Sequence, residues 1–279
     1  MKAKTLLDII NEEGTIFRDK EVFTIEYMPE NYKFRDHQLK KMAVHSRELK
    51  RDHKPQNMML VGPCASGKTT AVNKFFELVE EHYHNAVCVH VNCQSYTTEY
   101  KVFIKIHEKI FGQSVPVGGL STFSIYSKVM DYIIKENKIL IVALDDFDFI
   151  KTSKDLNRTL YTLLRAHETY PGAKVSVFTV TSHLSKMVID PNVITVFHPI
   201  EIQFPSYTRE EMFTILSERC RIGFYKDVIS DEIIQEVANR AYEIGDVRNG
   251  LKILTEIGEK TERNGSKYIL NKYINLTDN

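Results

Sequence analysis

A short apolar run that ends in a glycine-bearing loop constrains the fold of this chain more than any other feature. Residues 58–70 read MMLVGPCASGKTT, so that Gly62 is followed, after four residues, by Gly67, Lys68 and Thr69. In a loop of this spacing, successive backbone N–H groups converge on phosphates, the lysine adds a positive charge, and the threonine hydroxyl is placed to ligate Mg²⁺. A chance glycine-rich turn is the alternative.

The residues on both sides of the loop favour the phosphate-binding interpretation. The run 58–61 predicts a buried strand, and residues 70–79 have the apolar spacing of a helix. The loop therefore leads into a helix N-terminus, where unpaired N–H groups and the helix dipole favour an anion. We expect the phosphates to be held by the nine consecutive residues Gly62, Pro63, Cys64, Ala65, Ser66, Gly67, Lys68, Thr69 and Thr70.

Length and composition are those of a globular protein. The 279 residues carry 37 basic and 37 acidic side chains, so the net charge of zero gives no global sign of a polyanionic partner. The apolar runs are too short to span a bilayer and the N-terminus is interrupted by acidic residues, which predicts a cytoplasmic protein without membrane contact. The cysteines lack zinc-like spacing, which predicts isolated, reduced thiols at Cys64, Cys88, Cys93 and Cys220.

Short β-branched runs alternate with helical stretches, a pattern typical of a parallel sheet covered by helices on both faces. Further strands are predicted at 86–91, 138–144, 174–180 and 200–204. Two helical segments within 98–137 are separated by a Pro- and Gly-containing connection at 112–119. Beyond residue 208 the apolar spacing predicts only helices, at 208–221, 231–244 and 247–263.

A second element of the phosphate site is expected where the strand 138–144 ends. It delivers two carboxylates, Asp145 and Asp146, at the edge of a parallel sheet where ligands bind. Asp145 would hold Mg²⁺ directly or through water, and Asp146 would polarise an attacking water. The alternative is a polar cap on a strand.

An ordered set of short motifs resembles the AAA+ ATPase core of the archaeal replication initiators. These proteins are related to eukaryotic origin-recognition subunit one and to the cell-division-control loading factor. The resemblance extends from about residue 15 to about residue 270, and the phosphate loop is its most specific part. The other matching segments are YMPE at 27–30, RDHQL at 35–39, VNC at 91–93, VPVGGLS at 115–121, LDDFD at 144–148, FPSY at 204–207 and GDVR at 245–248.

The resemblance implies a P-loop NTPase fold with a parallel five-stranded sheet flanked by helices, followed by a small all-helical lid. We accordingly expect an N-terminal helix and extension at 1–20, an α/β domain at 21–205 and a lid at 206–279. It also implies that ATP or ADP binds with Mg²⁺. Tyr27, Met28 and Arg35 match the family segment that lies against adenine, Tyr207 matches a residue near the nucleotide, and Arg248 matches the arginine that reaches from the lid to the terminal phosphate.

Three positions depart from the family and predict slow hydrolysis. Asp146 stands where Glu is usual, and the shorter stem displaces the carboxylate that orients water. Ser182 stands where the family has an Asn that senses the terminal phosphate. Asn192 replaces the arginine that would serve a neighbouring subunit's nucleotide, so oligomerisation is possible without an arginine finger at that position.

The resemblance leaves three functions open. The first is an ATP-binding module of DNA replication initiation that hydrolyses ATP slowly, with catalytic residues Lys68, Asp146, Ser182 and Arg248, and with duplex DNA and other replication proteins as partners. The second is a nucleotide-dependent assembly module without turnover, and the third is an ATPase of a mobile element or defence system. Residues 115–130 match a DNA-touching insertion of the family but carry only Lys128, so a plain loop before an amphipathic helix is equally compatible. The chain ends at residue 279, where initiators continue into a winged-helix domain.

Overall fold

The structure is a computed structural model that describes residues 16–115, 119–150, 152–182 and 189–276. Its internal contacts divide the chain into two compact units. One unit comprises residues 34–205, and the other joins the segment that ends at Lys33 to the segment that begins at Ser206. Most of the predicted N-terminal segment 1–20, and the centre of the predicted insertion at 116–118, lie outside the described residues.

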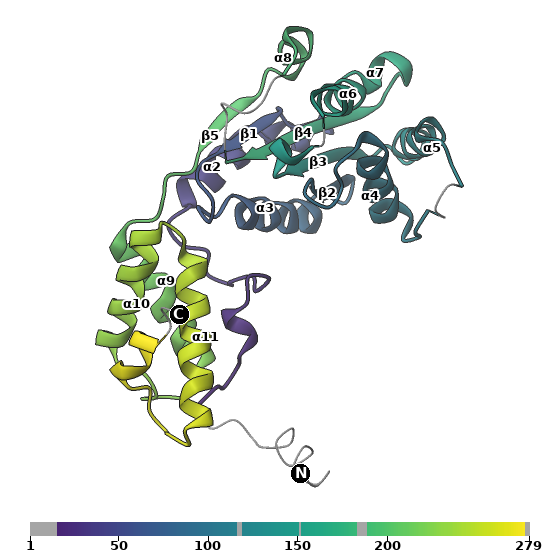
Figure 1. Ribbon diagram of the computed structural model, residues 1–279. Helices are drawn as coiled ribbons and strands as arrows, with labels where there is room; N and C mark the ends of the chain where they lie inside the picture. The colour runs from purple at the N-terminus through teal and green to yellow at the C-terminus, as the bar shows by residue number, and fades with distance from the viewer. Residues whose placement is uncertain (1–15, 116–118, 151, 183–188, 277–279) are drawn as a thin grey trace, which may run out of the picture. The chain divides into compact units, whose positions relative to one another are not determined.

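The first unit is built on a parallel sheet of five strands in the order β2-β3-β4-β1-β5 (Figure 1). Every pairing is parallel, and β2 is in register with β3 so that Asn92 lies opposite Asp145. The strands β1, β3 and β4 are buried almost throughout, as expected for runs rich in Val, Ile and Leu at the centre of a parallel sheet. The predicted strands are confirmed: β1 Met58–Val61, β2 Ala86–Asn92, β3 Ile139–Asp145, β4 Lys174–Thr181 and β5 Ile200–Gln203.

Helices pack on the two faces of this sheet, because alternate strand residues point to opposite sides. The ring of Phe178 on β4 contacts those of Phe75 and Phe76, which α3 contributes. The neighbouring Val177 belongs instead to the core shared with α4, α5 and α6. The helices of this unit are α2 Asp36–Val44, α3 Lys68–His82, α4 Glu99–Phe111, α5 Thr122–Lys135, α6 Ser153–Leu164, α7 Ala166–Thr169 and α8 Pro191–Phe197.

The second unit is helical in its C-terminal part, as predicted. It contains α9 Arg209–Gly223, α10 Asp231–Ile244 and α11 Val247–Arg263, followed by a short 3-10 turn. Thr208 and Glu211 form a reciprocal capping box at the start of α9, which satisfies two backbone N–H groups. Gly245 has a φ of 77° between α10 and α11, a left-handed conformation that glycine adopts without a steric penalty.

Residues 16–33 pack with the helical unit, whereas the sequence assigned residues 21–33 to the α/β domain. The 3-10 turn η1 Glu21–Phe23 follows an isolated antiparallel bridge between Phe17 and Phe224. The ring of Phe23 lies 4.7 Å from that of Phe224, centroid to centroid. The Arg219 guanidinium donates to the backbone oxygen of Val22. These contacts join segments that are far apart in the sequence, 197 residues in the case of Val22 and Arg219, which is why local sequence patterns place the boundary elsewhere.

We expect Phe23→Ala to destabilise the helical unit by about 3 kcal/mol, because truncating a buried aromatic side chain leaves a cavity. Phe23 is buried against Gly223, where a Cβ would overlap its ring. Hydrogen exchange should report the loss as faster exchange in α9 and α11, with β3 unchanged. Ile25→Ala is the matched control, because Ile25 is 70% exposed in the same segment. Equal effects of the two substitutions would contradict the packing of Phe23.

A buried histidine on α4 predicts a pH dependence of stability. His107 packs against the ring of Phe111, and burial together with the Lys128 ammonium lowers the pKa of His107. The unfolded state therefore binds more protons below about pH 6.5, and the free energy of unfolding should fall as the pH drops through that region. Urea denaturation at several pH values gives the free energy of unfolding at each pH. This free energy should change less with pH in His107→Leu than in the parent, whereas His82→Leu, at an exposed position, should show the parent's pH dependence.

Candidate functional site

The loop between β1 and α3 depends on close backbone approach and on left-handed conformations. A Cβ at Gly62 would overlap the carbonyl oxygen of Phe204, the residue that follows β5. The N–H of Phe204 donates to the oxygen of Val61 at 2.7 Å, which ties the end of β1 to that segment. Further along the loop, Ala65 has a φ of 55° and Gly67 a φ of 90°. Gly67 then begins α3 as its N-cap.

Arg35 stabilises this loop through hydrogen bonds to backbone oxygens. Its side chain is only 2% exposed, and its guanidinium donates at 2.8 Å to the backbone oxygens of Ser66, Phe34 and Pro205. An arginine satisfies three carbonyls from one planar fork, a geometry that lysine cannot reproduce. Sequence reasoning placed Arg35 beside adenine. In the structure its guanidinium links the phosphate loop to the segment before α2 and to the end of the sheet unit.

Lys68 is the first residue of α3, and its side chain folds back into the phosphate loop that precedes it. Its side chain is 6% exposed, and its ammonium donates to the oxygens of Gly62 and Pro63 at 2.7 Å each. It also donates at 3.2 Å to the hydroxyl of Ser182, which follows β4. The structure thus brings two predicted catalytic residues together, although 114 positions separate them in the sequence. The Cys64 thiol lies 3.6 Å from the same hydroxyl.

The two predicted metal ligands meet between α3 and β3. The Thr69 hydroxyl donates at 2.7 Å to Oδ2 of Asp145, which is buried. His90 on β2 places its Nε2 2.9 Å from the same oxygen. The backbone N–H of Asp146 donates to Oδ1 of Asp145 at 3.0 Å. Sequence reasoning missed His90, although its position two residues before Asn92 on a strand predicts that it shares a face with Asn92.

Asp146 follows β3 in a left-handed conformation with a φ of 51°. Its carboxylate accepts a hydrogen bond from the Gln94 amide at 2.7 Å. Burial raises the pKa of Asp146, and the nearby Asp145 carboxylate raises it further, while the Gln94 hydrogen bond opposes both effects. A carboxylate with this environment, at the carboxyl edge of a parallel sheet, is suited to orienting water.

The loop has the donors that a polyphosphate with a divalent cation requires. The first turn of α3 holds no acidic residue, so the helix itself places no carboxylate beside its N-terminal N–H groups. Ser66 Oγ is buried in the loop and forms no hydrogen bond with the described residues. Thr69 and Asp145 offer oxygen ligands of the kind that Mg²⁺ prefers. The residues present therefore fit Mg²⁺ and a nucleoside triphosphate.

The remaining predicted nucleotide residues belong to the helical unit. The Arg219 guanidinium lies 4.3 Å from the centre of the Tyr27 ring, and Met28 beside it is half-buried. Tyr207 is buried just before α9. Arg248, at the start of α11, pairs with Asp246 at 2.7 Å, and its side chain is 42% exposed. Within this unit the predicted residues thus occupy the N-terminal segment, the segment before α9 and the first turn of α11.

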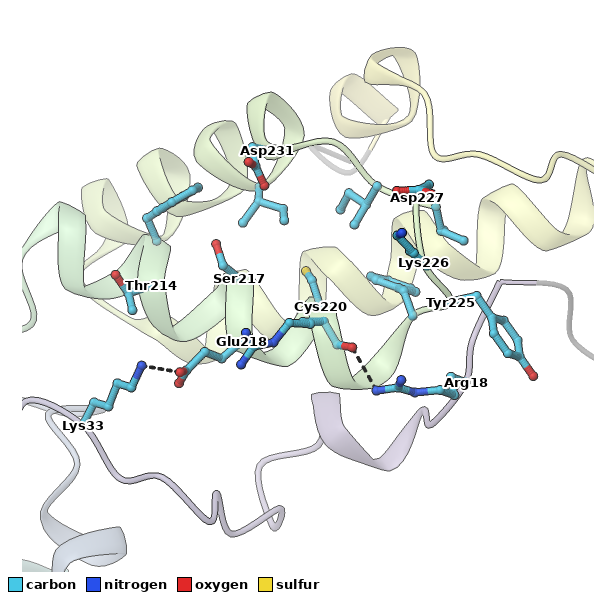
Figure 2. A pocket seen from close by; sticks show the side chains of 16 residues that line it. Arg18, Lys33, Thr214, Ser217, Glu218, Cys220, Tyr225, Lys226, Asp227 and Asp231 are labelled. Carbon is cyan, nitrogen blue, oxygen red and sulfur yellow. Dashed lines mark hydrogen bonds and ion pairs between the residues drawn. The ribbon is translucent and has the colours of Figure 1, made fainter.

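A groove of about 690 Å³ lies elsewhere in the helical unit (Figure 2). Ser217 and Cys220 line it from α9, and Arg18 and Tyr225 line it from the flanking segments. Its charged groups are partly paired, because Lys33 forms an ion pair with Glu218 and Arg18 donates to the Arg221 oxygen. The groove contains none of the residues that sequence reasoning assigned to the nucleotide.

Three further predictions can be compared with the described residues. Asn192 is exposed on α8, where the family arginine was expected. All four cysteines are free, and Cys64 alone among them is exposed, which confirms the expectation of isolated thiols. Among the described residues, no helix combines the length and the apolar character that crossing a membrane requires.

Comparison with known proteins assigns this chain to a family. A model of the Cdc6 AAA+ ATPase-type lid domain matches residues 213–278, and a model of the AAA domain matches residues 51–188. The ORC1-type DNA replication protein 2 of Methanothermobacter thermautotrophicus is 40% identical over 269 residues, which cover 96% of this chain and 71% of that protein. The chain belongs to the family of ORC1-type DNA replication proteins. The ORC1-type DNA replication protein 6 of Halobacterium salinarum is 39% identical, with 91% of this chain and 69% of that protein covered.

Solved structures of an archaeal ORC1 protein and of an archaeal Cdc6 protein have the same fold. The Aeropyrum pernix ORC1 protein, solved in complex with DNA, superposes with a TM-score of 0.83 at 26% identity and covers 95% of this chain and 69% of its own. Cdc6p from Pyrobaculum aerophilum superposes with a TM-score of 0.79 at 22% identity, a likeness of fold alone. The predicted AAA+ P-loop NTPase fold with a helical lid is therefore confirmed.

Proposed function

We propose that the chain is an ATP-dependent switch of DNA replication initiation, which binds ATP with Mg²⁺ at residues 62–70. The observation that carries this proposal is the 2.7 Å hydrogen bond between Thr69 and Asp145, because it joins two oxygen ligands that are 76 residues apart in the sequence. The chain's membership in the family of ORC1-type DNA replication proteins supports a role in replication initiation. The α3 N-terminus, Ser66 and Lys68 supply donors for the phosphates.

Each residue of the proposed site has a physical role. Lys68 exchanges its carbonyl partners for phosphate oxygens and neutralises their charge. Thr69 and Asp145 hold Mg²⁺, which would withdraw charge from the phosphates when bound. Asp146 orients the attacking water, with Gln94 fixing its carboxylate. Arg248 would give up its ion pair with Asp246 and bind the terminal phosphate instead. This exchange would couple the nucleotide state to the conformation of the lid.

Hydrolysis is proposed to be slow, because Asp146 and Ser182 replace longer side chains expected in the family. Ser182 offers only one hydroxyl, which already lies near both Lys68 and Cys64. We expect Asp146→Asn to reduce steady-state ATP turnover about 100-fold or to background while ATP affinity changes less than about threefold. Asp131→Asn, on the exposed face of α5, is the control and should retain parent turnover.

The same assay decides between the proposed switch and an assembly module without turnover. The reference rate is that of Lys68→Ala, which lacks the phosphate-facing ammonium. If the parent hydrolyses ATP no faster than Lys68→Ala but binds ATP tightly, the site is a structural nucleotide site. The role given to Asp146 would be contradicted if the parent and Asp146→Asn hydrolysed ATP at the same rate and both were well above the Lys68→Ala rate.

DNA binding is the second part of the proposal, supported by the likeness to an ORC1 protein solved with DNA. The chain has zero net charge, so the electrostatic contribution to DNA affinity must come from local basic residues. Lys128 on α5 lies 4.7 Å from the centre of the Phe111 ring, at the edge of the predicted insertion. Fluorescence anisotropy with duplex DNA over a salt series should show binding that weakens with salt. No binding at low salt would remove DNA from the proposal.

A further inference from the structure

A histidine on the strand beside Asp145 has no place in the functions described above. His90 lies on β2, and β2 pairs with β3 in parallel so that Asn92 is opposite Asp145. His90 is therefore two residues before the partner of Asp145 and points to the same side of the sheet. Its imidazole is mostly buried, and its Nε2 lies 2.9 Å from Oδ2 of Asp145.

The chemistry of this contact fixes the direction of the hydrogen bond. A carboxylate only accepts hydrogen bonds, so the imidazole nitrogen that faces Asp145 must carry a hydrogen and act as the donor. Asp145 then accepts from His90 and from the Thr69 hydroxyl on Oδ2, and from the Asp146 N–H on Oδ1. Three donors on three different elements leave the carboxylate one orientation. A buried carboxylate with fewer donors would lose both solvation and alignment.

We propose that His90 is a positioning residue that holds Asp145 in the orientation needed to bind Mg²⁺. The inference rests on the proposed binding of Mg²⁺ and ATP at residues 62–70. Partners that orient metal-ligating side chains commonly contribute 10- to 100-fold to metal affinity. His90 itself contacts neither the phosphates nor the metal in this role. It acts through the Asp145 oxygen, and the N–H donor is the only property that it contributes.

Four substitutions separate the donor from the bulk of the side chain. His90→Leu removes the donor, and His90→Asn carries an amide too short to reach Asp145. His90→Gln places an amide N–H near the position of Nε2 and should restore the hydrogen bond. His82→Leu, at the exposed end of α3, is the matched control. The Gln and Asn variants keep the test usable if the Leu variant does not fold.

The measurement is the affinity of the full chain for ATP as a function of free Mg²⁺, with an EDTA arm and an unfolding midpoint for each variant. Mg²⁺ should increase the affinity for ATP, and the free Mg²⁺ concentration that gives half of this increase is the quantity compared. We expect it to be about tenfold higher in His90→Leu and His90→Asn than in the parent. Their affinity for ATP in EDTA should equal that of the parent, and His90→Gln should match the parent in both conditions. Parent behaviour of His82→Leu shows that the effect belongs to position 90.

Three outcomes would overturn the inference. An unchanged Mg²⁺ requirement in His90→Leu and His90→Asn shows that Asp145 needs no third donor. An equal loss of affinity with and without Mg²⁺ assigns His90 to the packing of the sheet. A loss in His90→Gln as large as in His90→Asn, with a stronger effect for Mn²⁺ than for Mg²⁺, makes the imidazole a direct ligand. A parent that binds no ATP in either condition refutes the proposed function itself, which is a distinct result.

Discussion

Replacing Lys68 with alanine should weaken ATP binding about 100-fold. The ammonium group already lies within the loop, where it donates hydrogen bonds to three oxygens, those of Gly62, Pro63 and Ser182. Phosphate oxygens at that position would take over these hydrogen bonds and add full negative charge. A charge-assisted hydrogen bond contributes about 1.5–3 kcal/mol, and about 2.7 kcal/mol corresponds to a 100-fold change in affinity. Fluorescence titration with a labelled ATP analogue measures the change.

The matched control for this result is Lys74→Ala on the same helix. Lys74 pairs with Glu77 at 3.4 Å near the surface, an interaction that contributes little to stability or binding. It should retain parent affinity for ATP. Unfolding midpoints of both variants exclude a loss of fold as the cause. If Lys68→Ala binds ATP as tightly as Lys74→Ala, the loop does not hold the phosphates.

Substitution of Gly62 by alanine should destabilise the sheet unit by about 3 kcal/mol, near the upper end of the cost of overpacking. The new Cβ would overlap the Phe204 carbonyl, a backbone atom that cannot rotate away as a side chain does. The end of β1 would have to separate from the segment after β5, which breaks the 2.7 Å hydrogen bond from Phe204 to Val61. Chemical denaturation measures the lost free energy of unfolding.

Gly112→Ala provides the comparison for Gly62→Ala. Gly112 ends α4 with a φ of 65°, and a Cβ there meets nothing within 4 Å. It should cost about 1 kcal/mol from the left-handed conformation alone. A difference of about 2 kcal/mol between the two variants thus measures the effect of steric overlap. Equal costs would mean that the Phe204 backbone moves aside at little cost, so that its approach does not make glycine necessary at position 62.

The parts of the fold that depend on local patterns could be predicted from the sequence. The five strands are short apolar runs between turn-forming residues, and the helices α10 and α11 have regular apolar spacing, so their positions agree closely with the structure. The loop at residues 62–69 and the carboxylates after β3 were found because each feature is contiguous in the sequence. That Thr69 and Asp145 meet follows from the order of strands in parallel sheets.

Other features depend on contacts between distant segments and left no local signal. Arg35 is one of many charged residues in the sequence, and only the folded chain shows its guanidinium bound to three carbonyls. His90 alternates with apolar residues on a strand and becomes informative only beside Asp145. The packing of Phe17 and Phe23 on Phe224 likewise moves residues 16–33 into the helical unit.

The proposed switch depends on the binding of ATP together with Mg²⁺ by the loop at residues 62–70. Isothermal titration calorimetry of the full chain with ATP, in excess Mg²⁺ and in EDTA, measures this binding. We expect one ATP per chain and clearly tighter binding in Mg²⁺, because the Thr69 hydroxyl lies 2.7 Å from the Asp145 carboxylate. Absence of saturable binding, or an affinity that is identical in Mg²⁺ and EDTA, would contradict it.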